Sequence, residues 1–110
     1  MSIASSEEVT LTEPMHLILL SLLDGDRHGY AIMQDVESIT NGDVRMGPGT
    51  LYGAIKRLLQ AKLIVETEQR GGNDDERRRY YRITVLGRRV LDRHTAKLQR
   101  LVSFARRRTA

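Results

Sequence analysis

The sequence predicts a mainly α-helical domain with one small β-hairpin, arranged as three short helices, two strands and a long last helix. Apolar residues recur at spacings of three and four over residues 12–23, 28–40 and 48–63, which is the period of a helix packed on one side. Over residues 63–69 and 78–84 the sequence instead contains β-branched residues and a partial alternation of apolar and polar residues, which is typical of strands. With 110 residues, the chain is expected to form one domain with a modest core.

The predicted helices have recognisable start and stop signals. Thr12 is suited to cap the first helix, and Asp24-Gly25-Asp26 ends it. The second helix begins near His28 and stops at Asn41-Gly42, and Pro48 suits the first position of the third helix, where its missing N–H costs nothing. The candidate buried side chains of the second helix are Tyr30, Ile32, Met33, Val36 and Ile39.

The two strands are expected to form a hairpin. Its predicted loop, residues 70–77, reads RGGNDDER and is made largely of residues that tolerate tight turns. In the returning strand, Tyr81 and Ile83 share one face, and Tyr80 and Arg82 share the other. Three helices followed by a hairpin is the winged helix-turn-helix plan, in which the third helix enters a DNA groove and the hairpin reaches the backbone beside it.

Charge is distributed unevenly along the chain, although the net charge is only +4. Residues 1–44 hold Arg27 against eight acidic residues, whereas residues 77–110 hold twelve Arg or Lys against the single acid Asp92. Such a split favours a polyanion-facing side if the fold gathers the cations together. The alternative is a cationic helix that is simply exposed to water.

The predicted third helix has a polar face without any carboxylate. That face carries Thr50, Tyr52, Gly53, Lys56, Arg57 and Gln60. Small residues at the start of the helix, Gly47 and Gly49, leave clearance for close approach to phosphates, and Arg57 can bind phosphate or guanine. The alternative is that the glycines only make a turn and the cations only keep the helix soluble. Arginines on both sides of the hairpin loop, at 70 and 77–79, form a natural phosphate clamp and favour the DNA reading.

The last helix is expected to be long and amphipathic. Its apolar stripe exceeds what a winged helix needs for its own core, so the surplus is predicted to pack on a second copy, the alternative being a helix folded back onto its own domain. The candidate dimerisation residues are Leu91, His94, Leu98, Leu101, Val102 and Ala105. For His94, a partner across the dimer axis, a pH-sensitive element and a mere polar break all remain open. An effector pocket between the first and last helices would be lined by Met15, Leu19, Leu98 and Val102.

Motifs for catalysis or metal binding are not found in the sequence. The chain has no cysteine, and its three histidines, His16, His28 and His94, are too far apart to form a local metal motif. The acidic run Asp74-Asp75-Glu76 reads as a solvated loop tip. The polar, acidic N-terminus does not resemble a secretory signal, and the densest apolar run is far too short to cross a bilayer. We therefore expect a non-enzymatic cytoplasmic protein with no cofactor and no membrane contact.

Three segments together resemble the PadR-like family of transcriptional regulators. They are HGYAI (28–32), GPGTLYGAIKRLLQAKLI (47–64) and RRYYRITVLG (78–87). The resemblance implies a repressor that dimerises through its C-terminal helix, reads a palindromic operator with the third helix and the wing, and leaves DNA when a small molecule binds. It also implies that Gly49–Tyr52 begins the recognition helix and that Tyr30 lies near the DNA backbone.

The chain departs from part of the family pattern. A single helix follows the wing, as in the shorter subfamily, and the absence of tryptophan removes the aromatic stacking by which some short members hold drugs. The expected organisation is a flexible tail (1–10), a winged helix-turn-helix domain (11–84) and a dimerisation helix (85–110).

The expected partners are double-stranded DNA, a second copy and a possible small-molecule effector. The candidate DNA-binding residues are Tyr30, Gly49, Thr50, Tyr52, Lys56, Arg57, Arg70, Arg77 and Arg79. Two other functions stay open: a winged-helix protein-interaction module without specific DNA binding, and a ligand-sensing dimer whose DNA contact is secondary.

Overall fold

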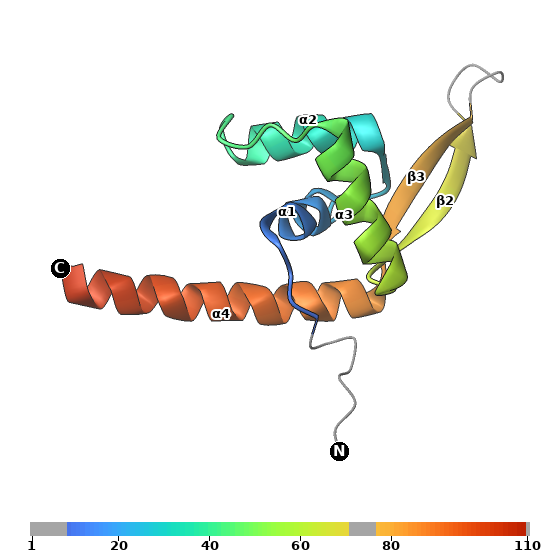
Figure 1. Ribbon diagram of the computed structural model, residues 1–110. Helices are drawn as coiled ribbons and strands as arrows, with labels where there is room; N and C mark the ends of the chain where they lie inside the picture. Colours follow the sequence, from blue (N-terminus) through green and yellow to red (C-terminus); the bar gives the residue numbers. More distant parts are fainter. Residues whose placement is uncertain (1–8, 71–76, 110) are drawn as a thin grey trace.

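The elements follow the predicted order in the computed structural model, which describes residues 9–70 and 77–109 (Figure 1). The elements are α1 (Glu13–Ser21), β1 (Arg27–His28), α2 (Gly29–Ile39), α3 (Pro48–Gln60), β2 (Ile64–Arg70), β3 (Arg77–Ile83) and α4 (Val85–Thr109). The mainly helical class, the winged helix-turn-helix plan and the long last helix are confirmed. The predicted tail falls mostly outside the described residues, although Val9 packs against the core.

The sheet has three antiparallel strands in the order β1-β3-β2, so the prediction of a two-stranded hairpin was incomplete. The third strand, β1, contains only Arg27 and His28, which pair with Tyr81 and Tyr80 of β3. Two residues cannot show an alternating pattern, and their partner strand is far along the chain. Local sequence signals therefore could not reveal β1, which ties the start of α2 to the wing.

The predicted caps explain where the helices begin. Thr12 Oγ1 accepts a hydrogen bond from the Met15 N–H at the start of α1. At α2 the capping group is the imidazole of His28, whose Nδ1 accepts from the Ala31 N–H at 3.2 Å. α3 begins at Pro48 as predicted, and its cap residue Gly47 makes no side-chain hydrogen bond.

The ends of α2 and α3 share one backbone motif. At α2, Asn41 has a φ of 53°, and the Gly42 N–H donates to the Glu37 carbonyl at 2.8 Å. At α3, Lys62 has a φ of 63°, and the Leu63 N–H donates to the Leu58 carbonyl at 3.0 Å. Both helices stop because a left-handed residue turns the chain back on the last turn. The second of these turns leads directly into β2.

The core surrounds α1, which contacts α2, α3 and α4. It contains aliphatic side chains from every helix and from the sheet, among them Ile18, Leu51 and Leu58, which have no exposed surface. In α2 only the narrow face of Ile32 and Val36, one turn apart, is fully buried. Tyr30 and Ile39, which we predicted to be buried, are 62% and 44% exposed. Tyr30 lies on the opposite side of α2, and Ile39 continues the buried face but is the last residue of the helix.

The end of α3, strand β3 and the start of α4 pack closely together. Thr84 Oγ1 donates to the Lys62 carbonyl at 2.8 Å and accepts from the Gly87 N–H at 2.9 Å, so Thr84 caps α4. Gly87 lies directly against the backbone of Leu63, and a methyl group there would overlap the Leu63 carbonyl oxygen. This packing fixes where α4 leaves the wing.

The two halves of α4 have different surroundings. Val90 and Leu91 are buried in the core, whereas every described residue beyond Leu98 is exposed. Figure 1 shows the C-terminal half continuing past α1 and away from the wing. The domain therefore buries only the first turns of the helix.

Candidate nucleic-acid interface

Three elements converge on one exposed hollow: the start of α2, the start of α3 and strand β3. The hollow has a volume of about 560 Å³. Its lining residues are His28, Gly29, Tyr30, Tyr52, Arg79 and Tyr81. Three residues predicted to bind DNA, Tyr30, Tyr52 and Arg79, thus lie around a single depression although they are far apart in sequence.

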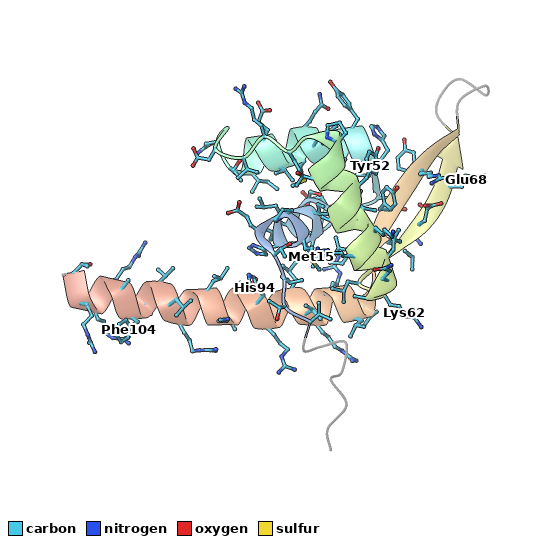
Figure 2. All side chains as sticks on the ribbon, in the orientation of Figure 1. Met15, Tyr52, Lys62, Glu68, His94 and Phe104 are labelled. Atoms are coloured by element: carbon cyan, nitrogen blue, oxygen red, sulfur yellow. The ribbon has the colours of Figure 1, made fainter. Side chains whose placement is uncertain are left out.

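Tyr52 is positioned by a glycine of the preceding helix. A methyl group at Gly29 would overlap the Tyr52 hydroxyl, so the phenol ring rests directly on the first residue of α2. Figure 2 shows Tyr52 on α3 beside α2. Tyr52 is 51% exposed, which leaves much of its ring accessible from outside. The two residues at the start of α2 therefore have different structural roles. His28 caps the helix, and Gly29 leaves space for the Tyr52 ring.

The inner wall of the hollow is formed by residues that sequence reasoning did not assign to the site. Tyr81 is buried, and this burial, followed by the nearby Glu66 carboxylate, raises the pKa of its phenol. Tyr81 thus stays neutral at neutral pH. The His28 ring makes an edge contact with Tyr80, with ring centroids 5.3 Å apart. Only the pairing of β1 with β3 brings these rings together, and no local signal in the sequence announces it.

The polar face of α3 is accessible and unobstructed. Gly49, Thr50, Lys56 and Arg57 are all exposed. Methyl groups added at Gly47, Gly49 and Gly53 would meet no other element of the fold within 4 Å, so packing inside the domain does not require glycine at these positions. A smaller hollow of about 270 Å³ separates the starts of α1 and α3, and Arg57 is part of its lining.

The cations near this face fall into two groups. Arg82 donates two hydrogen bonds to the Asp26 carboxylate, with nitrogen–oxygen distances of 2.8 and 3.0 Å. Arg27 donates to the Ser21 carbonyl at 2.8 Å. These two guanidinium groups fasten the sheet to the turn after α1. Among the described side chains, Arg79 approaches Glu66 at a long 4.0 Å, and this contact between exposed groups contributes little. Arg79 therefore remains accessible to an outside anion.

The predicted arginine clamp around the wing loop is only partly described. Arg70 and Arg77 pair through their backbones at the far end of the hairpin, but their side chains, and those of residues 71–76, lie outside the described part of the chain. The arginine clamp thus remains a prediction at Arg70 and Arg77. Arg79 is the member whose side-chain position is known.

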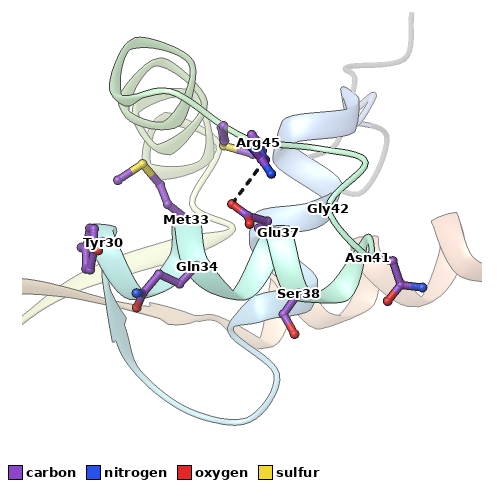
Figure 3. Close-up of a pocket in the computed structure, with 9 residues that line it drawn as sticks. Tyr30, Met33, Gln34, Glu37, Ser38, Asn41, Gly42 and Arg45 are labelled. Carbon is purple, nitrogen blue, oxygen red and sulfur yellow. Dashed lines mark ion pairs between the residues drawn. The ribbon is translucent and has the colours of Figure 1, made fainter.

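A larger hollow on α2 has a different character. It measures about 860 Å³ and lies along α2 and the loop that follows, with Tyr30 at its end (Figure 3). It carries both signs of charge, since Arg45 approaches Glu37 at 3.9 Å. A surface with mixed charge is less suited to a polyanion than the hollow around Tyr52 and Arg79.

The sequence matches the model of the transcriptional regulator PadR-like family over residues 18–93, most of the chain. The chain belongs to the PadR-like family of transcriptional regulators. The matched region extends from α1 into the first half of α4 and includes every residue around the Tyr52 hollow. The exposed half of α4 lies beyond it.

Individual relatives are similar to this PadR-like chain over different lengths. A 37.1 kDa protein of transposon TN4556 from Streptomyces fradiae is 39% identical over 85 residues, which are 77% of this chain but 23% of that protein. Protein X of Lysinibacillus sphaericus is 37% identical over 75 residues, 68% of either chain. The chain thus spans about a quarter of the first relative and two thirds of the second.

Solved structures of the family share the fold. A PadR family transcription regulator from Clostridium difficile superposes with a TM-score of 0.77 at 22% identity, covering 90% of this chain and all of that one. Bacillus subtilis PadR, solved in complex with operator DNA, gives a TM-score of 0.65 at 20% identity, covering 74% of this chain and 45% of that one. At these identities the likeness concerns the fold.

The residues predicted for dimerisation and for effector binding lie in several environments. Leu91 is 3% exposed in the core of its own domain, so its side chain is not available to a partner. Leu98 is half-buried, and Leu101, Val102 and Ala105 are exposed along the projecting half of α4. Of the predicted effector pocket, Met15 and Leu19 belong to the core, whereas Val102 is exposed.

Metal binding and membrane insertion find no support in the described residues. No three or more His, Asp or Glu side chains among them are grouped as metal ligands would be. Among the same residues, none of the helices has the length and apolar character needed to cross a bilayer.

Proposed function

We propose that this PadR-like regulator binds double-stranded DNA sequence-specifically and acts as a dimeric repressor on a palindromic operator. The observation that carries the proposal is the convergence of Tyr30, Tyr52 and Arg79 on one hollow beside the acid-free face of α3. Phosphate recognition uses hydroxyl and guanidinium donors of this kind. The operator complex of Bacillus subtilis PadR, a protein of the same fold, supports this choice of partner.

The geometry suggests a division of labour between the elements. The first turns of α3 enter the major groove, where Thr50, Lys56 and Arg57 reach base edges or phosphates. Tyr30, Tyr52 and Arg79 contact backbone phosphates at the groove edge, since Tyr52 lies at the start of α3 and the other two come from α2 and β3 beside it. The open space at Gly49 and Gly53 lets the α3 backbone approach the duplex closely.

The proposed dimer uses the projecting half of α4. Leu98, Leu101, Val102 and Ala105 share one helical face with His94 and continue the stripe that the domain buries through Leu91. A contiguous apolar face of this kind is normally covered in a soluble protein. Two-fold pairing of α4 with a second copy would cover it and would place two recognition helices on two half-sites.

The remaining parts of the proposed function concern regulation and location. We propose that a small-molecule effector releases the regulator from DNA, binding where α1 and α4 meet near Met15, Leu19, Leu98 and Val102. The site of action is the cytoplasm, and the protein acts by binding and not by catalysis. Family membership supports these points, and each can fail while DNA binding holds.

Fluorescence anisotropy with a duplex from just upstream of the protein's own gene tests the function. A scrambled duplex of equal length and composition is the control, and both are titrated over a salt series. We expect selective binding with log K falling steeply against log salt, by close to one per phosphate contact. Weak, equal binding to both duplexes would overturn the proposal and favour the protein-interaction module.

A further inference from the structure

Two histidines from distant parts of the sequence meet between α1 and α4. The His16 and His94 rings make an edge contact, with centroids 4.5 Å apart and planes inclined at 63°. Both residues are half-buried. Figure 2 shows His94 where α4 passes α1 close to Met15. The contact therefore joins the central helix of the domain to the helix that projects from it.

His94 lies at the point along α4 where a small change in direction moves the end of the helix a long way. Val90 and Leu91 are anchored in the core, His94 follows one turn later, and beyond Leu98 every described residue is exposed. From His94 to Thr109 the helix extends a further ~22 Å at 1.5 Å per residue, so a tilt of about 10° at His94 would move its end by about 4 Å. A small change at this contact thus redirects the whole projecting half.

The charges around the pair make it sensitive to protonation. On α1, Glu13 lies one turn before His16 and partly offsets an added positive charge. On α4, Arg93, Lys97 and Arg100 line the same hollow as His94, and from the described part of the N-terminal segment, which starts at residue 9, Val9, Thr10 and Leu11 line it as well. The pKa of His16 is lowered mainly by burial and, to a smaller extent, by repulsion from His94. Two protonated rings at this spacing, next to three cations, would repel each other.

We propose that the His16–His94 contact is a pH-sensitive joint that holds α4 against α1 while both rings are neutral and releases it when they become protonated. Neutral imidazoles attract each other edge to face, and charged ones do not. Release lets the projecting half of α4 change direction relative to the winged helix. The joint belongs to the single chain and does not depend on DNA binding. An effect of this release on the distance between the two recognition helices of a dimer, however, rests on the proposed function.

The orientation of α4 can be followed directly because the chain has no native cysteine. Cysteines placed at the exposed positions Ser38 on α2 and Ser103 on α4 take spin labels, and excess unlabelled protein keeps the measured distances within one chain. Between about pH 7.5 and 5, which brackets ordinary histidine titration, we expect the distance distribution to shift and broaden. The same samples report operator binding separately, so failure of the joint and failure of the DNA proposal are distinguishable.

Three variants separate this joint from other titrations. His94→Phe, and independently His16→Phe, keep an aromatic edge contact without a titratable ring, and each should hold the acid-pH distance at its neutral-pH value. His28→Gln removes the histidine that caps α2 and touches Tyr80, and should leave the pH response intact. An unchanged distance in the wild type, or a full pH response in both Phe variants, would overturn the proposal.

Discussion

Two regions of this chain expose cations with few acids among them, and they differ in what surrounds the cations. On the α3–wing face, Arg57 and Arg79 lie beside tyrosine hydroxyls, bare glycine backbone and two hollows. On the projecting half of α4, the cations flank an apolar stripe, and Arg108 stacks on the exposed ring of Phe104 at 4.4 Å. The first region suits a polyanion, whereas the second suits another apolar helix.

The difference teaches that summed charge does not identify a nucleic-acid surface. Residues 77–110 form one basic block in the sequence, but the fold divides it between the wing and α4. In Figure 1 the projecting half of α4 points away from the wing and from the start of α3. Arg82 belongs to the same block and forms a bidentate contact with Asp26 of its own domain. Only part of the basic half is therefore expected to face DNA.

The largest expected effect comes from comparing two helical glycines, Gly87 in the buried first turn of α4 and Gly53 on the exposed face of α3. Gly87→Ala should lower the free energy of unfolding by about 3 kcal/mol or more, because the methyl group would overlap the Leu63 carbonyl. Gly53→Ala should raise it by about 0.5–1 kcal/mol, since alanine is the better helix former and meets no atom there. Urea denaturation of both variants measures the contrast.

Gly53→Ala also tests whether the bare face of α3 approaches DNA. If it does, the more stable variant should bind the operator less tightly than the wild type. Unchanged affinity in a stabilised Gly53→Ala protein would show that no partner comes close at this position. A destabilised Gly53→Ala protein would contradict the open surroundings of Gly53.

The next effect concerns the apolar stripe of α4. Leu98→Glu should weaken the dimer by a factor of about 100 or more, because each copy would bring a carboxylate into an apolar contact. Ser103→Glu adds the same charge on the opposite side of α4, and the dimer should survive it. Sedimentation velocity distinguishes the two variants. A Leu98→Glu protein that sediments like the wild type would remove this stripe from the interface.

The sequence could predict those features that are encoded within a few neighbouring residues. Thr12, Pro48 and Asn41-Gly42 mark helix ends correctly because caps and turns are local hydrogen-bond motifs. The apolar period over residues 48–63 likewise predicted a helix packed on one side, and on that side of α3 Leu51 and Leu58 have no exposed surface. The polar face of α3 followed from the same periodicity, and the structure leaves that face accessible.

What sequence reasoning missed depends on contacts between distant segments. Strand β1 is two residues long and exists only because β3 pairs with it. The contact of Tyr52 with Gly29 and the contact of His16 with His94 also form between separate elements. Leu91 fits the apolar stripe of α4 but lies in the domain core, because periodicity cannot tell which turn of a helix leaves the domain.

The smallest expected effect is a pH dependence of stability that arises where His16 of α1 meets α4. The pKa of His16 lies below its usual 6.5, so the folded chain binds fewer protons there than the unfolded chain. This contribution is fully present above about pH 6.5, decreases as the pH falls below that value, and levels off below the folded-state pKa. Thermal unfolding should show a weaker acid-side decline in His16→Phe. An identical decline in the variant would assign the effect elsewhere.

The most direct test of the central claim compares arginines from the two regions in operator binding. Arg57→Ala and Arg79→Ala should each weaken binding by about 1–3 kcal/mol or reduce the salt slope by about one, whereas Arg106→Ala on α4 removes the same charge and should do neither. Anisotropy titrations over a salt series measure all three variants beside the wild type. Equal losses for Arg106→Ala and Arg57→Ala would contradict the claim that the α3–wing face, and not the basic half as a whole, meets DNA.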